Sequence, residues 1–365
     1  MAAVISTERT PEEAVAAVAV AVAARSGSLV EAAYRDLVAV PKSELAESSA
    51  RIGPWLAGLL GQMPPWYGAV YAVVVGALVE WNADAVECAP AVLGGLDRSL
   101  RQAIEFVPLW RERFGEEEDL PDPTGLPDGQ VQERLGSDSS SEWYNPYIGW
   151  HTVHKWERAA VAVLADPRVR RHADLTRLVE LAKALDPDYG DLQCALRALL
   201  LLDDEPLLVM DRASGKAFRM RMSGISGNYQ LQTLLAGVLV GGGHLPGQAP
   251  SPEAVAISST AEIDMDRLGD LPLATECFNF AEPSGRWIWG EATPSRIPVV
   301  DGIRQLVLDP PVYRHVYRAI RFLPRVRASV ELEAVLDPAE AAPYFAKVRP
   351  LMPPDDTGRL AADGY

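Results

Sequence analysis

Apolar residues in the first 114 positions recur every third or fourth residue, in one stretch after another. This spacing is typical of helices that bury one face, and short breakers such as Ser26-Gly27 and Met63-Pro64-Pro65 separate the stretches. The predicted helices are 11–25, 28–39, 43–62, 65–81, 84–93 and 96–114. Helices of this length form either a bundle or HEAT-like stacked hairpins, and no repeat period in the sequence decides between the two.

The helical pattern stops between residues 115 and 142. This segment is rich in Glu, Asp, Pro, Gly and Ser, so it cannot bury enough apolar surface to offset the entropy lost on ordering. We expect an acidic flexible linker or loop, and we place the domain boundary here. A helical domain then covers residues 1–114, a helical segment leading into an α+β domain covers 143–350, and 351–365 form a polar tail.

The spacing of apolar residues changes within the second part of the chain. Helical spacing continues at first, and two short stretches with strand-like spacing then flank a turn at Asp211–Gly215. The predicted helices are 145–165, 172–184, 190–203, 229–240 and 338–347. The predicted strands are 206–210, 216–222, 254–258, 287–289 and 305–308. The fold class is therefore α+β: a helical N-terminal domain, then a smaller domain of helices and a largely antiparallel sheet.

The composition narrows the choice of partners and compartment. A formal net charge of −16 repels nucleic-acid phosphates and anionic lipid headgroups, so we expect no nucleic-acid and no membrane partner. The apolar run 66–79 is shorter than the roughly 20 residues that span a bilayer as a helix. The N-terminus lacks an early basic region, and Glu8, Glu12 and Glu13 precede its apolar run, unlike in a secretion signal. The 3 cysteines are widely spaced and odd in number, so they indicate a reducing compartment and not a disulfide framework. The sequence therefore predicts a soluble cytoplasmic protein.

Motifs that would name a cofactor are missing from the sequence. It contains no P-loop, no Rossmann glycine triplet and no Gly-x-Ser-x-Gly nucleophile motif. The cysteines do not have the spacing of zinc ligands. We therefore predict no cofactor and no metal site.

The first candidate site lies on the predicted helix 145–165. His151, His154 and Glu157 are three residues apart, which places two imidazoles and a carboxylate along one ridge of the helix. Glu157 falls within the apolar arc of this helix, so it requires a partner such as His154 or an arginine. The ridge is either a structural histidine–carboxylate pair or a catalytic acid–base site.

Aromatic residues gather around the start of the same helix. Trp143, Tyr147 and Trp150 belong to this group, and rigid amphipathic rings are typical of binding surfaces and ligand pockets. The same rings are also used where one domain docks on another, which is the interpretation that we favour.

The second candidate site is a basic segment near residues 312–327. If this segment is helical, Arg314, Arg318 and Arg321 share one face and form an anion-binding clamp. The alternative is that these arginines pair with the many acidic residues of the chain.

Two functions from different classes follow from these features. The first is a cytosolic binding or accessory protein that engages a protein or peptide partner through its helical surface and its aromatic residues. The second is an enzyme that acts on an anionic small molecule or peptide in a cleft between the domains, where the histidine ridge faces the arginines.

Overall fold

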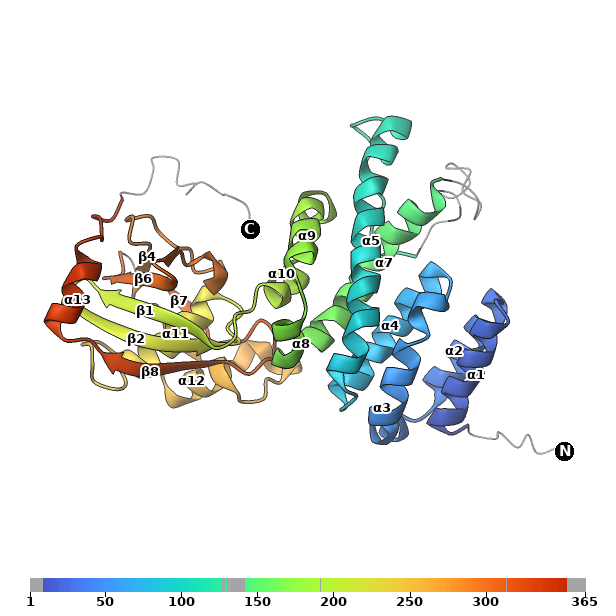
Figure 1. The fold of residues 1–365 in the computed structure, drawn as a ribbon, viewed down its shortest axis with the longest axis horizontal. Coiled ribbons are helices and arrows are strands. Elements are labelled where there is room, and N and C mark those ends of the chain that lie inside the picture. Colours follow the sequence, from blue (N-terminus) through green and yellow to red (C-terminus); the bar gives the residue numbers. More distant parts are fainter. Residues whose placement is uncertain are drawn as a thin grey trace. The chain divides into compact units, whose positions relative to one another are not determined.

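The computed structural model describes residues 9–126, 129, 131, 142–190, 192–312 and 314–352 (Figure 1). The chain forms two compact units that divide between Leu199 and Leu200. The first unit is helical, and the second combines a mixed sheet with helices. The predicted α+β class, with helices first and a mixed domain after them, is confirmed.

Several helices of the first unit, among them α1 (Pro11–Ala23) and α5 (Ala85–Phe114), begin where the sequence supplies a side-chain cap. Thr10 and Glu13 form a reciprocal capping box at the start of the first helix, and Asp84 accepts a hydrogen bond from the amide of Val86. The unit consists of α1 (Pro11–Ala23), α2 (Gly27–Ala39), α3 (Lys42–Ala57), η1 (Leu60–Gln62), α4 (Pro65–Glu80), α5 (Ala85–Phe114), α7 (Tyr144–Leu164), α8 (Pro167–His172), α9 (Thr176–Tyr189) and α10 (Gln193–Leu199).

Helix α5 continues through Gly94 and Gly95, where the sequence predicted a break, so that prediction is wrong. A Cβ atom on Gly95 would lie 2.2 Å from the ring of Trp156, whereas one on Gly94 would meet nothing within 4 Å. Gly95 therefore makes room for the buried indole of α7. The packing against Trp156 holds the helix together across a pair of residues with poor helix propensity.

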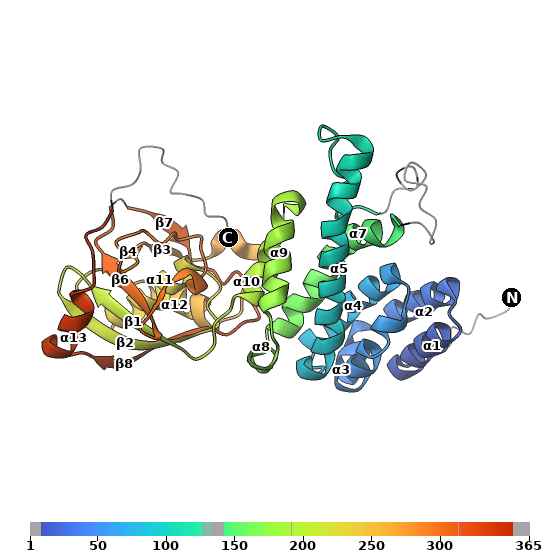
Figure 2. The same cartoon turned by 45° about the horizontal axis from the view of Figure 1, so that its top comes forward.

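Helix α7 is the most deeply buried helix of this unit and packs against α4 and α5. Figures 1 and 2 both show it crossing α5, with α1 to α4 on one side and α9 on the other. A Cβ atom on Gly149 would lie 2.3 Å from the side chain of Gln102, so the two backbones approach closely there. Ser99 donates a hydrogen bond to the carbonyl of Gly149, and its hydroxyl lies 3.0 Å from that of Thr152.

The division between the units lies elsewhere than the sequence suggested. We placed a boundary within 115–142, but α5 and α7 pack together on either side of this segment and belong to one unit. Its first part contacts α7, because Trp150 donates a hydrogen bond to the carbonyl of Pro121 at 2.8 Å. Residues 127, 128, 130 and 132–141 of the predicted linker lie outside the described residues, as do 353–365 of the predicted tail.

The second unit begins with the predicted hairpin. The left-handed conformation of Gly215 and a hydrogen bond from the Ser214 amide to the Asp211 carboxylate close its turn. The unit consists of β1 (Glu205–Asp211), β2 (Lys216–Ser223), α11 (Asn228–Leu239), α12 (Pro252–Ser259), η2 (Met265–Asp270), β3 (Leu273–Thr275), β4 (Asn279–Ala281), η3 (Pro294–Arg296), β5 (Val299–Val300), β6 (Ile303–Asp309), β7 (Val316–Arg318), β8 (Ser329–Val335) and α13 (Pro338–Phe345).

The main sheet of this unit has the strand order β4-β6-β1-β2-β8, with β5 also paired to β6. The pair β1–β6 is parallel and the other pairs are antiparallel. Side chains alternate between its faces: Leu207 and Val209 belong to the core with α11, and Leu208 and Met210 to the core with α13. Helices α11 and α13 accordingly lie on opposite faces of the sheet (Figures 1 and 2).

Two predicted strands of this unit are wrong. Residues 254–258 belong to α12, because Ser251 caps the helix and Pro252 occupies its first turn. Residues 287–289 contribute only an isolated bridge between Trp287 and Ala281.

Replacement of Gly95 by alanine tests the packing of α7 on α5. The added methyl group must displace the buried indole of Trp156, so we expect Gly95→Ala to lower the free energy of unfolding by about 1–3 kcal/mol. Gly94→Ala is the matched control and should raise the same quantity by about 0.5–1 kcal/mol, because alanine favours a helix and nothing lies in its way. Chemical denaturation followed by circular dichroism measures both. A stabilising Gly95→Ala would contradict this packing.

Candidate functional site

The predicted histidine ridge lies on α7, inside the helical unit. His151 is only 2 % exposed, and neither of its ring nitrogens has a hydrogen-bond partner among the described residues. Burial lowers the pKa of His151 to about 4, against the opposing influence of the Gly125 and Pro123 backbone. Burial and the neighbouring charge of Lys155 lower the pKa of His154 to about 4 as well. Both imidazoles are therefore neutral at pH 7, and the ring of His151 is closed to solvent.

Glu157 is buried, at 8 % exposure, as the helical wheel predicted. Its carboxylate accepts a hydrogen bond from the amide of Ala195 at 2.8 Å, in the first turn of α10. A carboxylate at this position satisfies a helix-terminal N–H group and interacts favourably with the helix dipole. The expected partner, His154, instead lies 2.8 Å from the ammonium group of Lys155. These contacts favour a structural role for Glu157.

The predicted aromatic surface is mostly core. Tyr147 and Trp150 are buried, and both rings contact Phe106 of α5 at centroid distances of 5.8 and 5.4 Å. Trp150 also contacts Tyr189 of α9 at 5.1 Å. Only Trp143 is half-buried. The aromatic residues therefore join helices of one unit, because their spacing on α7 directs them towards its two neighbours.

The predicted arginine clamp does not form, because the segment that carries it is not a helix. Strand β7 spans Val316–Arg318 and the residues on either side of it are not helical, so the three arginines do not share a helical face. The side chains of Arg314 and Arg318 are exposed. Arg321 is 3 % exposed and donates hydrogen bonds to the carbonyls of Ile257, Ala261 and Pro324. Arg321 thus holds α12 to the loop after β7 and is not available to an anion.

A site that the sequence reasoning missed lies where β3 and β7 pack against α11. The antiparallel register places Ala274 opposite Tyr317. Two residues further along the chain, the amide of Glu276 donates a hydrogen bond to the carbonyl of His315. Opposite residues of an antiparallel pair lie on the same face, so Glu276, His315 and Tyr317 share one face. A strand period, in which every second residue lies on the same face, would group His315 with Tyr317, whereas the helical period expected for this segment does not.

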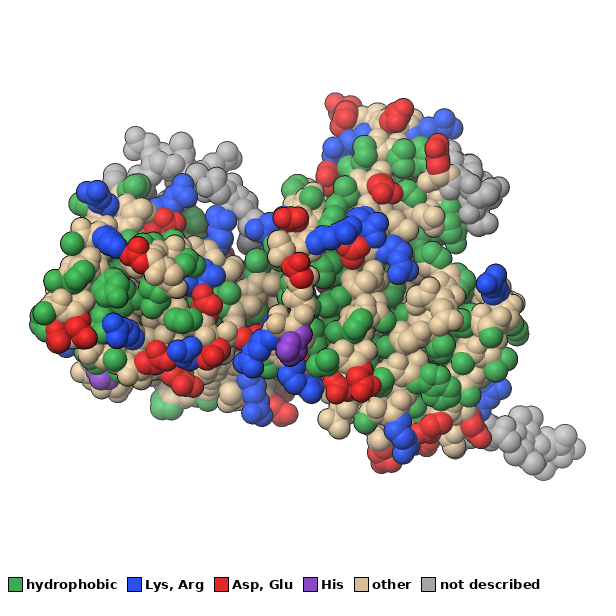
Figure 3. All heavy atoms as spheres, in the orientation of Figure 1, with side chains coloured by type: hydrophobic (Ala, Val, Ile, Leu, Met, Phe, Trp, Pro, Cys, Tyr) green, Lys and Arg blue, Asp and Glu red, His purple; other side chains and the backbone are tan. Residues whose placement is uncertain are grey.

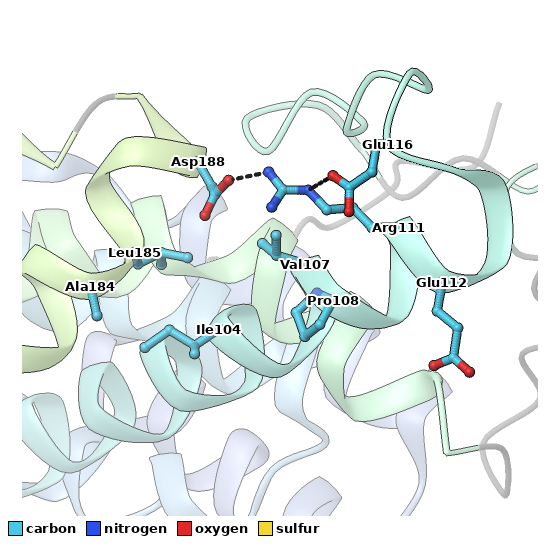
Figure 4. Close-up of a pocket in the computed structure, with 9 residues that line it drawn as sticks. All are labelled: Ile104, Val107, Pro108, Arg111, Glu112, Glu116, Ala184, Leu185 and Asp188. Atoms are coloured by element: carbon cyan, nitrogen blue, oxygen red, sulfur yellow. Dashed lines mark hydrogen bonds and ion pairs between the residues drawn. The ribbon is translucent and has the colours of Figure 1, made fainter.

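A groove lies between α5 and α9 in the helical unit, with a volume of about 570 Å³ (Figure 4). Its apolar lining consists of Ile104, Val107 and Pro108 from α5, which recur at helical spacing, and of Ala184 and Leu185 from α9.

Charged side chains form the rim of this groove. Arg111 contacts Asp188 at 2.6 Å and Glu116 at 3.4 Å, and Glu112 also lines the groove. Figure 4 shows the guanidinium of Arg111 between the two carboxylates that it contacts. Three carboxylates against one guanidinium leave the rim acidic. On the face shown in Figure 3, acidic and basic side chains are otherwise interspersed, without one continuous acidic field.

Other classes of site find no support within the described part of the chain. No group of three or more histidine, cysteine, aspartate or glutamate side chains there is placed to hold a metal ion. No helix among these residues is both long and apolar enough to cross a membrane. No protein-family model, curated protein or solved structure matches the chain.

Replacement of Arg321 tests its role as a structural anchor. Arg321→Gln leaves buried carbonyls without donors, so we expect the free energy of unfolding to fall by about 3 kcal/mol. Arg318→Gln, which removes an exposed arginine three residues earlier, should cost less than about 1 kcal/mol. Urea denaturation measures both variants. If the two substitutions lower the free energy of unfolding equally, the hydrogen bonds from Arg321 to the three carbonyls do not stabilise the fold as proposed.

Proposed function

We propose that this chain is a cytoplasmic binding or accessory protein, and that its helical unit engages a partner protein through the groove between α5 and α9. The observation that carries the proposal is the groove itself, with apolar residues of α5 at positions i, i+3 and i+4, two further apolar residues of α9 and a charged rim. Grooves of this kind accept the apolar face of an amphipathic helix.

The rim indicates the charge of the partner. Arg111 is already engaged by Asp188 and Glu116, and Glu112 adds a further negative charge. A partner helix with lysine or arginine beside its apolar residues would complement this rim, whereas an acidic one would be repelled. The occupant that we propose is therefore a basic amphipathic helix.

The properties of α7 support this function over an enzymatic one. His151 is enclosed and neutral, and Glu157 accepts a hydrogen bond at a helix N-terminus. General acid–base catalysis requires a titrating group within reach of its substrate. His151, His154 and Glu157 motivated the enzymatic alternative. They meet this requirement poorly, because the ring of His151 is enclosed and Glu157 is engaged by a backbone amide.

A binding measurement with a blocked groove tests the proposal. The probe is a short fluorescent amphipathic peptide of leucine and lysine, and fluorescence anisotropy at physiological ionic strength follows its binding. Ala184 is exposed in the groove, so Ala184→Arg places a bulky cation there without opening the core. We expect this variant to weaken binding by about tenfold or more, since it both fills the groove and repels lysine.

Two controls separate the groove from the general acidity of the chain. Ala50→Arg adds the same side chain at an exposed position of α3 and should leave binding unchanged. A peptide with glutamate in place of lysine should not bind. Equal loss in the two arginine variants, or no saturable binding by the lysine peptide, would refute the proposal.

A further inference from the structure

The second unit contains a cluster of aromatic and acidic side chains where α11 meets β3 and β7. The rings of Tyr229, His315 and Tyr317 contact one another, with centroid distances of 4.7 Å for the two tyrosines, 5.1 Å for Tyr229–His315 and 6.0 Å for His315–Tyr317. All three side chains are partly exposed. A Cβ atom on Gly290 would lie 2.4 Å from the Tyr229 ring, so the position of this ring requires a glycine at residue 290.

Two carboxylates lie beside these rings. The hydroxyl of Tyr229 donates to Glu291 at 3.0 Å, and Nδ1 of His315 lies 3.5 Å from Glu276. Nε2 of Gln232 donates to the same Glu276 carboxylate at 3.3 Å. The contacts of Glu276 with His315 and Gln232 are thus long for charge-assisted hydrogen bonds.

The electrostatics of Glu276 leave room for a cation. Burial raises its pKa; the neighbouring His315 opposes this shift, and the charge of Glu291 adds to it. Two carboxylates close enough to repel each other are stabilised by a further positive charge.

A side chain that contacts Glu276 also carries a buried acceptor. Gln232 is 2 % exposed, and its amide nitrogen also donates to the carbonyl of Phe278. Because a carbonyl can only accept, this bond fixes which end of the amide is nitrogen. The oxygen of this amide has no hydrogen-bond partner among the described residues.

We propose that this cluster is a binding site for an organic cation, a guanidinium or ammonium group that contacts the exposed aromatic rings and the carboxylates of Glu276 and Glu291. The rings attract the cation through their negative faces, and the carboxylates supply the counter-charge. The cation belongs either to a side chain of a protein partner or to a small free molecule, since the recognising chemistry is the same for both.

Nuclear magnetic resonance of the full chain tests the site, with methylguanidinium chloride and tetramethylammonium chloride as probes. We expect saturable shifts in the amides of α11 and β7 and in the ring signals of His315. Glu276→Gln should weaken methylguanidinium binding by about tenfold, as for loss of one strong charge contact. Tyr229→Leu should weaken the binding of tetramethylammonium, which has no N–H group to donate and relies on the rings.

The control is Glu331→Gln, which removes an exposed carboxylate of β8 and should leave both affinities unchanged. If Glu276→Gln disturbs the fold, Glu291→Gln takes its place, because Glu291 is exposed. Shifts that do not saturate, or an equal loss of binding in Glu331→Gln, overturn the proposal. A capped arginine peptide that binds more tightly than methylguanidinium assigns the cation to a protein side chain, and weaker binding assigns it to a free molecule.

Discussion

The contact between Trp156 and the backbone of α5 at Gly95 is the interaction on which the helical unit depends. A side chain at Gly95 would collide with the indole ring, so these two residues set the distance between α5 and α7. Fixing α7 in this way brings Tyr147 and Trp150 against Phe106 and Tyr189, and it places Glu157 at the N-terminus of α10. The rest of the unit is thereby built around one buried helix.

Local chemistry allowed several elements to be predicted from the sequence. Thr10 and Glu13 set the start of α1, and the turn that ends at Gly215 set the register of β1 and β2. In each of these cases the residues that determine the structure are neighbours in the chain. The burial of Glu157 followed equally from its position in the apolar arc of one helix.

The features that the sequence did not reveal depend on residues far apart in the chain. Gly94 and Gly95 are poor helix formers, and only the distant Trp156 explains why α5 continues through them. The segment around β7 adopts a strand because it pairs with β3, which overrides any helical period in its arginines. The contact of His315 with Glu276 also arises from that pairing, so no motif could announce it. The units likewise divide after α10 because α7 packs on α5 across the acidic segment.

The two proposed sites share one physical principle. In each, carboxylates lie beside apolar or aromatic surface, at the rim of the α5–α9 groove in one unit and beside Tyr229 in the other. A chain of net charge −16 attracts cations, and these two places combine that attraction with apolar contact. The apolar or aromatic surface would then determine which ligand binds, and the carboxylates would speed the approach of a cationic ligand.

Native-state hydrogen exchange tests most directly whether α7 is the central element of a unit that it shares with α5. If the packing at Gly95 and Trp156 joins the two helices, the most protected amides of α5 and α7 should have the same free energy of opening. The two values should also fall with the same dependence on denaturant concentration. The amides of β1 and β2 in the second unit provide the comparison. Opening of α7 together with those strands and independently of α5 would contradict this organisation, and it would place the division of the chain between α5 and α7.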